Sequence, residues 1–393
     1  MKYRLRVLPL AAAGLIMTAA CASHQGQLSA ITTAQRCAGA KAVILIVGAH
    51  QNAPKPMLDP PVVCQLTTAI EAGDPVRIVV ASSQPQVITP QLPSQANATL
   101  AEQHSPWVEG DVERVEGAVA AARPEAPGVD DLAALEVAAD EARALGASDA
   151  DLVLVDSGLD DRGAVDFTVP GLVAATPAEV VGQLKATGNV PDLQGFTVTL
   201  VGIGYTAAPQ PPLSAKWRSN VTAIWVAILQ AAGARVEVIP QPSQGPSVST
   251  AEPVRLVPVP ATQQVTPGYH KILVFTGASP VRFQPSTTAF VDQADAIRAL
   301  TPTARWLAAN RSRDARLEGT TADVGPMSGQ IALSRLRADR VRAVLILLGA
   351  SAAQISTTGV GSDFPQFTPD RNKAGTLLAG PATLNRSVRI TLG

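Results

Sequence analysis

The chain has 393 residues, which is enough for two globular domains and a leader. Hydrophobic residues make up 46% and aromatic residues only 4%, which excludes a disordered chain and predicts cores built from small aliphatic side chains. A formal net charge of −1 argues against general electrostatic binding to nucleic acid or to an anionic membrane surface. We therefore expect no nucleic-acid partner.

The amino terminus carries the pattern of an export signal. Three basic residues precede an apolar run from Leu8 to Ala20, which is too short for a convincing transmembrane helix. The run ends in Thr18-Ala19-Ala20-Cys21, which resembles a lipobox. We expect a signal peptide at 1–20, a palmitate-type lipid on Cys21 and a tether at 21–37. The protein would then be extracytoplasmic and held on the cell membrane. The alternative is plain cleavage after Ala20.

Two further cysteines, Cys37 and Cys64, remain in the exported part. Outside the cytoplasm such a pair favours a disulfide over two free thiols, although buried thiols stay an alternative. The cysteines and histidines show no metal-ligand spacing, and no cofactor motif occurs. We therefore expect neither a metal nor a cofactor.

Residues 38–245 alternate between apolar runs and helical patterns, which predicts a mostly parallel, layered α/β domain. Residues 85–110 interrupt the rhythm with Pro, Gln and Ser and are expected to form a long loop. The predicted strands are Lys41–Val47, Val76–Ala81, Asp151–Val155, Phe196–Val201 and Arg235–Ile239. The predicted helices lie at about 60–72, 129–145, 176–187 and 213–232.

Polar residues follow three of these strands, at the edge where α/β proteins place their ligands. His50, Asp156 and Ser157 are the residues from which a nucleophilic set would be assembled. However, no Gly-x-Ser-x-Gly elbow occurs. The Asp156-Ser157 pair also resembles the metal-binding edge of von Willebrand A domains, but the first strand lacks their Asp-x-Ser-x-Ser ligands. We expect turn formers here and no enzyme, while a partner-binding role of this domain stays open.

Proline punctuates residues 246–267 and predicts an extended linker, in which Val254–Val259 is a candidate edge strand. Residues 268–393 follow with a β-α-β-α-β-β order. Its strands are expected at Ile272–Phe275, Val281–Phe283, Ala315–Thr320, Gln354–Thr358 and Ser387–Leu392, and a helix kinked near Pro302 is expected at Asp292–Ala309.

The most informative stretch is the loop Glu318–Gly325 and the helix that follows it. Apolar residues at near-helical spacing predict one apolar face, formed by Leu333, Leu336, Val341, Val344 and Leu348. Gly349 lies where such a helix ends. The first turns also carry Ser334 and Arg337, so the helix start suits a carboxylate-bearing ligand.

These residues resemble the OmpA-like peptidoglycan-binding domain. The matching pieces occur in order: Gly319-Thr-Thr-Ala322-x-x-Gly325, Leu333-Ser334-x-x-Arg337-Ala338, Gly359-x-Gly361 and Asn385-Arg386-x-Val388. The resemblance covers about 268–393 and implies an α/β sandwich. The Arg-, Ala- and Pro-rich composition is similar to that of exported actinobacterial lipoproteins.

The resemblance also implies a site for diaminopimelate of the peptidoglycan stem peptide. Arg337 matches the arginine that pairs with its carboxylate. The family's aspartate for the ammonium group is replaced by Ala322, and Asp323 follows it. The other residues carried over are Gly319, Thr321, Asn385 and Arg386.

Three functions remain after these comparisons of motifs, and one of them, suggested only by the loops at the carboxyl edge, is an enzyme that uses the first α/β domain. The first is a cell-envelope lipoprotein that binds peptidoglycan non-covalently and links membrane to cell wall. The alternative is an envelope scaffold whose degenerate OmpA-like domain no longer binds diaminopimelate and contacts other envelope proteins.

Overall fold

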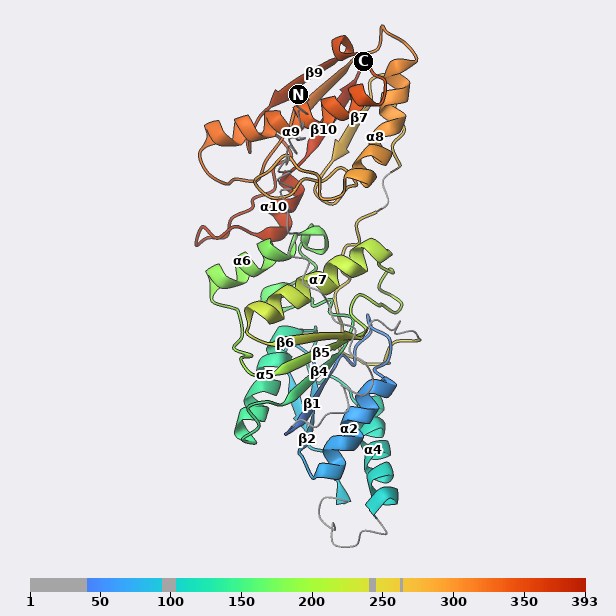
Figure 1. The fold of residues 1–393 in the computed structure, drawn as a ribbon, viewed down its shortest axis with the longest axis vertical. Coiled ribbons are helices and arrows are strands. Elements are labelled where there is room, and N and C mark those ends of the chain that lie inside the picture. Colours follow the sequence, from blue (N-terminus) through green and yellow to red (C-terminus); the bar gives the residue numbers. More distant parts are fainter. Residues whose placement is uncertain (1–40, 94–103, 240–244, 262–263) are drawn as a thin grey trace, which may run out of the picture.

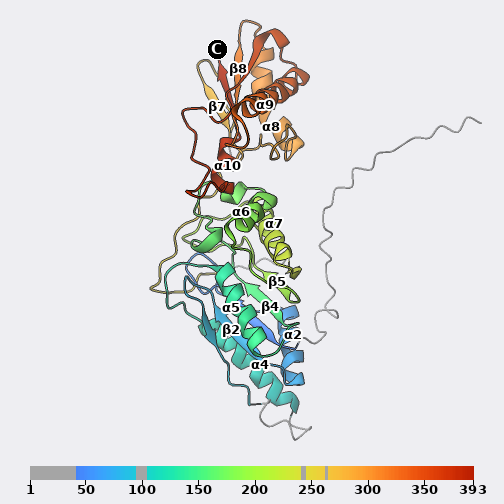
Figure 2. The same cartoon turned by 90° about the vertical axis from the view of Figure 1, so that its left-hand side faces the viewer.

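The computed structural model describes residues 41–93, 104–239, 245–261 and 264–393. Two sheets with their helices lie one above the other along the long axis, and α6 and α10 lie where the two halves meet (Figure 1). The turned view shows the same order (Figure 2). The mixed α/β fold, with a parallel-rich first sheet and a smaller second sheet, is the fold class predicted from the sequence.

The first sheet has the strand order β3-β2-β1-β4-β5-β6, and only β3 runs antiparallel to its neighbour. The parallel strands β1, β2, β4, β5 and β6 start and end in register, so their carboxyl ends form one edge. Their bounds are Val43–Val47, Val76–Val80, Asp151–Val155, Thr197–Val201 and Arg235–Ile239. The five predicted strands are confirmed within a few residues.

Helices cover both faces of this sheet, which explains why its central strands are apolar at every position. One apolar cluster joins the sheet to α5, α6 and α7, and the other joins it to α2 and α4. These helices span Pro60–Ala72 (α2), His104–Ala121 (α4), Asp131–Ala144 (α5), Pro177–Thr187 (α6) and Ala215–Ala231 (α7). Short 3-10 turns at Gly163–Val165 (η2) and Leu172–Ala174 (η3) lie between β4 and α6.

Two elements fall in the region expected to be a long loop. The edge strand β3 spans Gln86–Ile88, and α4 begins at His104. The prediction of a loop over the whole of 85–110 is therefore wrong. The strand is too short to show an alternating pattern, and the helix follows a segment rich in breakers, so neither gave a clear signal.

Residues 245–261 pack against the carboxyl edge of the first sheet. Asn52 Nδ2 donates to the Arg255 carbonyl at 2.9 Å, and the Arg255 amide donates to Asp161 Oδ2 at 2.7 Å. Gln210 and Val257 exchange two hydrogen bonds, at 3.0 and 2.8 Å. The candidate strand at Val254–Val259 does not form, because these side chains take up its backbone groups instead of a neighbouring strand.

The second sheet has the order β7-β10-β8-β9. Strand β10 runs antiparallel to β7 and β8, whereas β8 and β9 are parallel. The long helices α8 and α9 pack on one face around a cluster that includes Phe275 and Phe290. The elements span Ile272–Phe275 (β7), Gln293–Ala308 (α8), Ala315–Gly319 (β8), Met327–Leu347 (α9), Ile355–Gly359 (β9), Ala379–Asn385 (α10) and Val388–Leu392 (β10), with a 3-10 turn η4 at Ala352–Gln354.

Three details of this domain differ from the sequence-based expectation. Val281–Phe283 forms a single bridge between Phe283 and Phe290 instead of a strand. Helix α8 runs through Pro302 without a break. An additional helix, α10, precedes the last strand. It was not predicted, because Gly380 and Pro381 within it have low helix propensity.

In the part of the chain that the structure describes, no helix is both long and apolar enough to span a bilayer. Cys21 and Cys37 lie outside the described residues, and so do the signal peptide and the tether. Lipidation of Cys21 and the pairing of Cys37 with Cys64 therefore remain predictions. Cys64 itself lies in α2, where its side chain is partly buried.

Candidate functional site

Two glycines let helix α9 lie directly on the ends of two strands. Gly319 ends β8 and Gly359 ends β9, and the two are paired in the parallel ladder. A Cβ atom on Gly319 would lie 1.9 Å from the Ser334 carbonyl oxygen, and one on Gly359 would lie 2.3 Å from the Arg335 amide nitrogen. Neither backbone atom can move aside without disturbing α9. The glycines therefore bring the first half of the helix onto the strand ends.

The first half of α9 buries polar side chains. Gln330, Ser334 and Arg337 are 3%, 0% and 1% exposed, whereas Leu336 is 54% exposed. The predicted apolar face is therefore wrong for these turns and holds only from Ala338 onward, where Val341, Val344 and Leu345 are buried. A polar interior at this end of the helix costs stability unless its groups are satisfied. It marks the place where the domain departs from simple core packing.

Arg337 is a buried cation that forms no ion pair with any residue that the structure describes. Its Nε donates to the Thr287 carbonyl at 3.0 Å and one Nη donates to the Gln284 carbonyl at 3.2 Å. The other Nη makes no hydrogen bond within the described residues. Burial lowers the pKa of Arg337 to about 9, with a further contribution from nearby Arg386, and this still leaves it charged at neutral pH. The geometry leaves one donor of a desolvated guanidinium free for an anion.

The position where the family has its aspartate is occupied by Ala322, which is 5% exposed. The carboxylate of neighbouring Asp323 already has two partners within the domain. Gln330 Nε2 donates to its Oδ1 at 2.9 Å, and Arg371 pairs with its Oδ2 at 3.3 Å. The Asp323 side chain is also about half exposed. These contacts hold Asp323 as the partner of a surface arginine.

Asp370 places a second carboxylate beside this loop. Its Oδ2 accepts hydrogen bonds from the Asp323 amide at 3.0 Å and from Asn385 Nδ2 at 2.9 Å. Its Oδ1 has no hydrogen-bond partner in the described chain, although the residue is only 1% exposed. The sequence places Asp370 with Asp363 and Arg371 in a polar loop that could rim a groove, and a solvated loop is the favoured interpretation; the burial of Asp370 was not predicted, because nothing in the local sequence separates it from Asp363.

Thr321 and Asn385 make hydrogen bonds that connect the loops around the site. The Thr321 amide donates to the Gly361 carbonyl at 2.9 Å, while its buried hydroxyl makes no hydrogen bond in the described structure. Asn385 joins the Thr368 amide and carbonyl, at 2.9 and 2.7 Å. Together with Asp370, Asn385 thus closes the long loop before α10 against the loop after β8.

Arg386, by contrast, already has a partner from the first domain. Both of its Nη groups donate to the carboxylate of Glu179 on α6, one of them at 2.8 Å. The two side chains are 6% and 11% exposed. The structure therefore brings Gly319, Thr321, Asp323, Arg337, Asn385 and Arg386 into one end of the second domain, where Arg337 has no ion-pair partner among the described residues.

The polar residues at the carboxyl edge of the first sheet do not assemble a nucleophile. His50 Nε2 lies 2.8 Å from Asp156 Oδ1, and the Ser157 hydroxyl accepts from the Leu159 amide at 3.4 Å. No His50–Ser157 hydrogen bond occurs in the described part of the chain. All three residues are buried, at 5% exposure or less.

An acidic cluster lies behind the same edge. Burial, together with the charges of Asp156 and Asp160, raises the pKa of Asp131 well above its ordinary range. Burial likewise raises the pKa of Asp160, with a contribution from Asp130. Among residues 41–93, 104–239, 245–261 and 264–393, no group of three or more acidic, histidine or cysteine side chains is arranged to hold a metal ion. The side chains of Asp131 and Asp160 are fully buried and do not open to solvent.

Comparisons with known proteins found similar solved structures but no similar curated sequence. No curated protein sequence matches the chain. The peptidoglycan-associated lipoprotein of Burkholderia pseudomallei is 25% identical, covering 29% of this chain and 94% of its own, with a TM-score of 0.25. The periplasmic domain of Helicobacter pylori MotB is 20% identical, covering 31% and 74%, with a TM-score of 0.26. An outer membrane protein of Borrelia burgdorferi is 22% identical, covering 34% and 96%, with a TM-score of 0.24.

The sequence of the second domain itself matches a family model. The model describes the OmpA family and matches residues 282–375, which include the loop after β8, all of α9 and Asp370. The C-terminal third of this chain therefore carries an OmpA family domain.

Proposed function

We propose that the second domain binds peptidoglycan non-covalently through diaminopimelate of the stem peptide. The observation that carries the proposal is Arg337, a guanidinium that is 1% exposed and has no carboxylate partner within the described residues. A buried charge of this kind is costly unless an anion completes its hydrogen bonds. Arg337 also stands where the OmpA family motif places the arginine for the diaminopimelate carboxylate.

The ammonium group of the same ligand needs a carboxylate opposite Arg337. Asp323 is held by Arg371, so we assign this role to Asp370, whose Oδ1 is buried and unpaired within the described chain. Asp370 accepts the amide of Asp323, the residue that follows Ala322, and therefore lies beside the position that lost the family's aspartate. A charge-assisted hydrogen bond at such a carboxylate contributes about 1.5–3 kcal/mol.

Sedimentation with insoluble, diaminopimelate-containing peptidoglycan tests this function. Arg337→Ala in the full chain should abolish measurable retention. Arg335→Ala is the matched control, since Arg335 lies two residues earlier on α9 and is exposed. A thermal melt of each variant checks that the fold is kept. Equal retention of wild type and Arg337→Ala would refute the assigned site.

We further propose that the chain works as an extracytoplasmic lipoprotein in the cell envelope. The support is the lipobox-like Thr18-Ala19-Ala20-Cys21 behind a basic, apolar leader. A lipid on Cys21 would fix one end to the membrane while the second domain holds the cell wall. The first domain would then be the part free to contact other envelope proteins.

The second candidate function is an envelope scaffold that no longer holds the cell wall. Two observations favour it: Ala322 replaces the family's aspartate, and Arg386 is already paired with Glu179. This candidate predicts that wild type and an Ala322→Asp variant are both lost from the peptidoglycan pellet. The peptidoglycan-binding proposal predicts that wild type is retained.

A further inference from the structure

One of the carboxylates at the candidate site comes from the first domain. The carboxylate of Glu179 on α6 accepts hydrogen bonds from both Nη groups of Arg386, so the two side chains form a bidentate ion pair. This is the geometry in which an arginine holds a free carboxylate ligand. Since both side chains are nearly buried, solvent screens the pair little.

Neighbouring contacts fix Glu179 in this position. The Thr176 hydroxyl donates to Glu179 Oε2 at 2.8 Å. One helical turn later, Gln183 Oε1 accepts from the Ala379 amide at 2.8 Å, at the start of α10. Helix α6 is thus docked on α10 by contacts from Glu179 to Gln183.

The backbones also come unusually close beside this contact. Gly171 adopts a φ of +89°, and a Cβ atom on it would lie 2.4 Å from the Gly380 carbonyl oxygen. Ala379 packs within the apolar cluster of the first domain. The docked arrangement is therefore built into the packing as well as into the ion pair.

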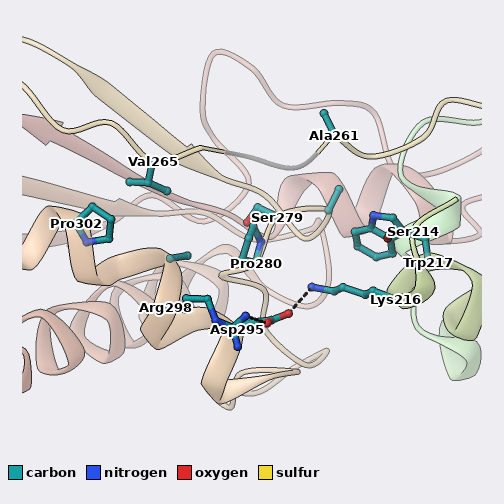
Figure 3. Close-up of a pocket in the computed structure, with 12 residues that line it drawn as sticks. Ser214, Lys216, Trp217, Ala261, Val265, Ser279, Pro280, Asp295, Arg298 and Pro302 are labelled. Carbon is teal, nitrogen blue, oxygen red and sulfur yellow. Dashed lines mark hydrogen bonds and ion pairs between the residues drawn. The ribbon is translucent and has the colours of Figure 1, made fainter. Parts of the chain in front are cut away.

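The other side of the junction is more open. Lys216 of α7 reaches across to Asp295 of α8, with 3.0 Å between Nζ and Oδ2 (Figure 3). This ion pair lies at a cavity of about 340 Å³, whose walls include Trp217 from the first domain and Pro280 from the second. The side chains of Lys216 and Asp295 are 30% and 22% exposed, so solvent reaches this pair. The junction is thus tight at α10 and hollow at α8.

We propose that Glu179 is an internal competitor of the ligand: docking of α6 on α10 and binding of a carboxylate-bearing ligand at Arg386 exclude each other. This inference rests on the proposed function, in which Arg337 holds the ligand's carboxylate: Arg386 is close enough to Arg337 to lower its pKa, and Glu179 is close enough to raise it, so the pair borders the same site. A second carboxylate beside Glu179 would meet a like charge in a nearly buried place. The ligand therefore binds the undocked molecules, and its apparent affinity falls by the undocked fraction.

The experiment measures docking and peptidoglycan binding separately on the full chain. A zero-length carbodiimide joins Lys216 to Asp295 only while the two domains are docked, and mass spectrometry quantifies this cross-link. The Lys41–Asp149 pair, at 3.4 Å within the first domain, provides the internal reference. Retention on insoluble peptidoglycan is measured on untreated protein. The variants are Glu179→Gln and Glu179→Arg, and the control is Asp192→Asn, which removes one charge from a pair with Arg143.

Both Glu179 variants should lower the Lys216–Asp295 cross-link relative to the reference and raise retention, by roughly tenfold if about a tenth of the wild-type molecules are undocked. Asp192→Asn should match wild type in both measurements. Fewer cross-links with unchanged retention would overturn the competition but leave peptidoglycan binding standing. Unchanged cross-linking in both variants would also overturn it. Loss of every variant and wild type from the pellet would instead refute the proposed function.

Discussion

Asn385 holds Asp370 by a 2.9 Å hydrogen bond from its Nδ2 to one carboxylate oxygen, while the other oxygen remains unpaired in the described structure. A carboxylate that is 1% exposed and only half satisfied needs a donor. The same domain contains the half-satisfied guanidinium of Arg337. One ligand with both an acceptor and a donor would complete both groups, and diaminopimelate has this chemistry.

Asp370→Asn should weaken peptidoglycan retention by roughly tenfold or more, because it removes the charge opposite the ligand's ammonium group. The amide oxygen still accepts from Asn385 and from the Asp323 amide, so the loop is expected to keep its shape. Asp363→Asn is the control, since Asp363 is exposed in the same loop. Equal retention of the two variants would argue against Asp370 as the ammonium partner.

The competing assignment to Asp323 has its own test. Because Asp323 pairs with Arg371 on the surface, Asp323→Ala should change retention little. Ala322→Asp should partly restore binding to Asp370→Asn, since it returns a carboxylate to the family's position. A large loss in Asp323→Ala, together with normal retention of Asp370→Asn, would transfer the role to Asp323.

The stability of the first domain should depend on the protonation of Asp151. Burial is the main cause that raises its pKa from 3.8 to about 6, and Glu237 adds to it. Since the folded-state pKa is raised, this stabilisation is full below the unfolded value and is lost as pH rises to about 6. Two pKa units correspond to about 3 kcal/mol.

Asp151→Asn removes this titration and keeps an oxygen for Gln65, which now donates to Asp151. Urea unfolding should show the variant gaining up to about 3 kcal/mol relative to wild type between about pH 4 and about pH 7. Asp149→Asn, at a half-exposed position two residues earlier, should show no such trend. A pH-independent difference for Asp151→Asn would contradict the assigned cause.

Anchoring by Cys21 is tested by fractionation of cells that produce the exported chain. Cys21→Ser removes the thiol that would carry the lipid, so the protein should move from the membrane pellet to the soluble fraction. A lipid chain supplies about 0.8 kcal/mol per buried CH₂ group, which accounts for the expected difference. If the Cys21→Ser protein stays in the membrane fraction, the predicted lipidation of Cys21 is wrong.

The core strands could be predicted because strands that are buried on both faces appear in the sequence as continuous apolar runs. Val43–Val47 and Asp151–Val155 are covered on both faces, and such strands have apolar residues at almost every position. The edge strand β3 has only three residues, and α10 contains Gly380 and Pro381, so neither shows a period. A very short strand and a helix that contains glycine and proline were therefore not predicted.

The candidate site was predictable in part for a similar reason. Arg337 lies in a family motif of fixed spacing, so it was found from the sequence. Its burial among polar neighbours was not found, since the glycines at 319 and 359 act only through the packing of α9 on the strand ends. The Glu179–Arg386 pair joins residues of different domains, and no local pattern links them.

The most direct test of the account compares two soluble stem-peptide fragments that differ only in one residue. One contains diaminopimelate, and the other contains lysine, which lacks the side-chain carboxylate assigned to Arg337. Calorimetric titration of the full chain should show at least a roughly 30-fold preference for the diaminopimelate fragment, and Arg337→Ala should lose this preference. Equal binding of both fragments by wild type, or a preference that survives in Arg337→Ala, would contradict it.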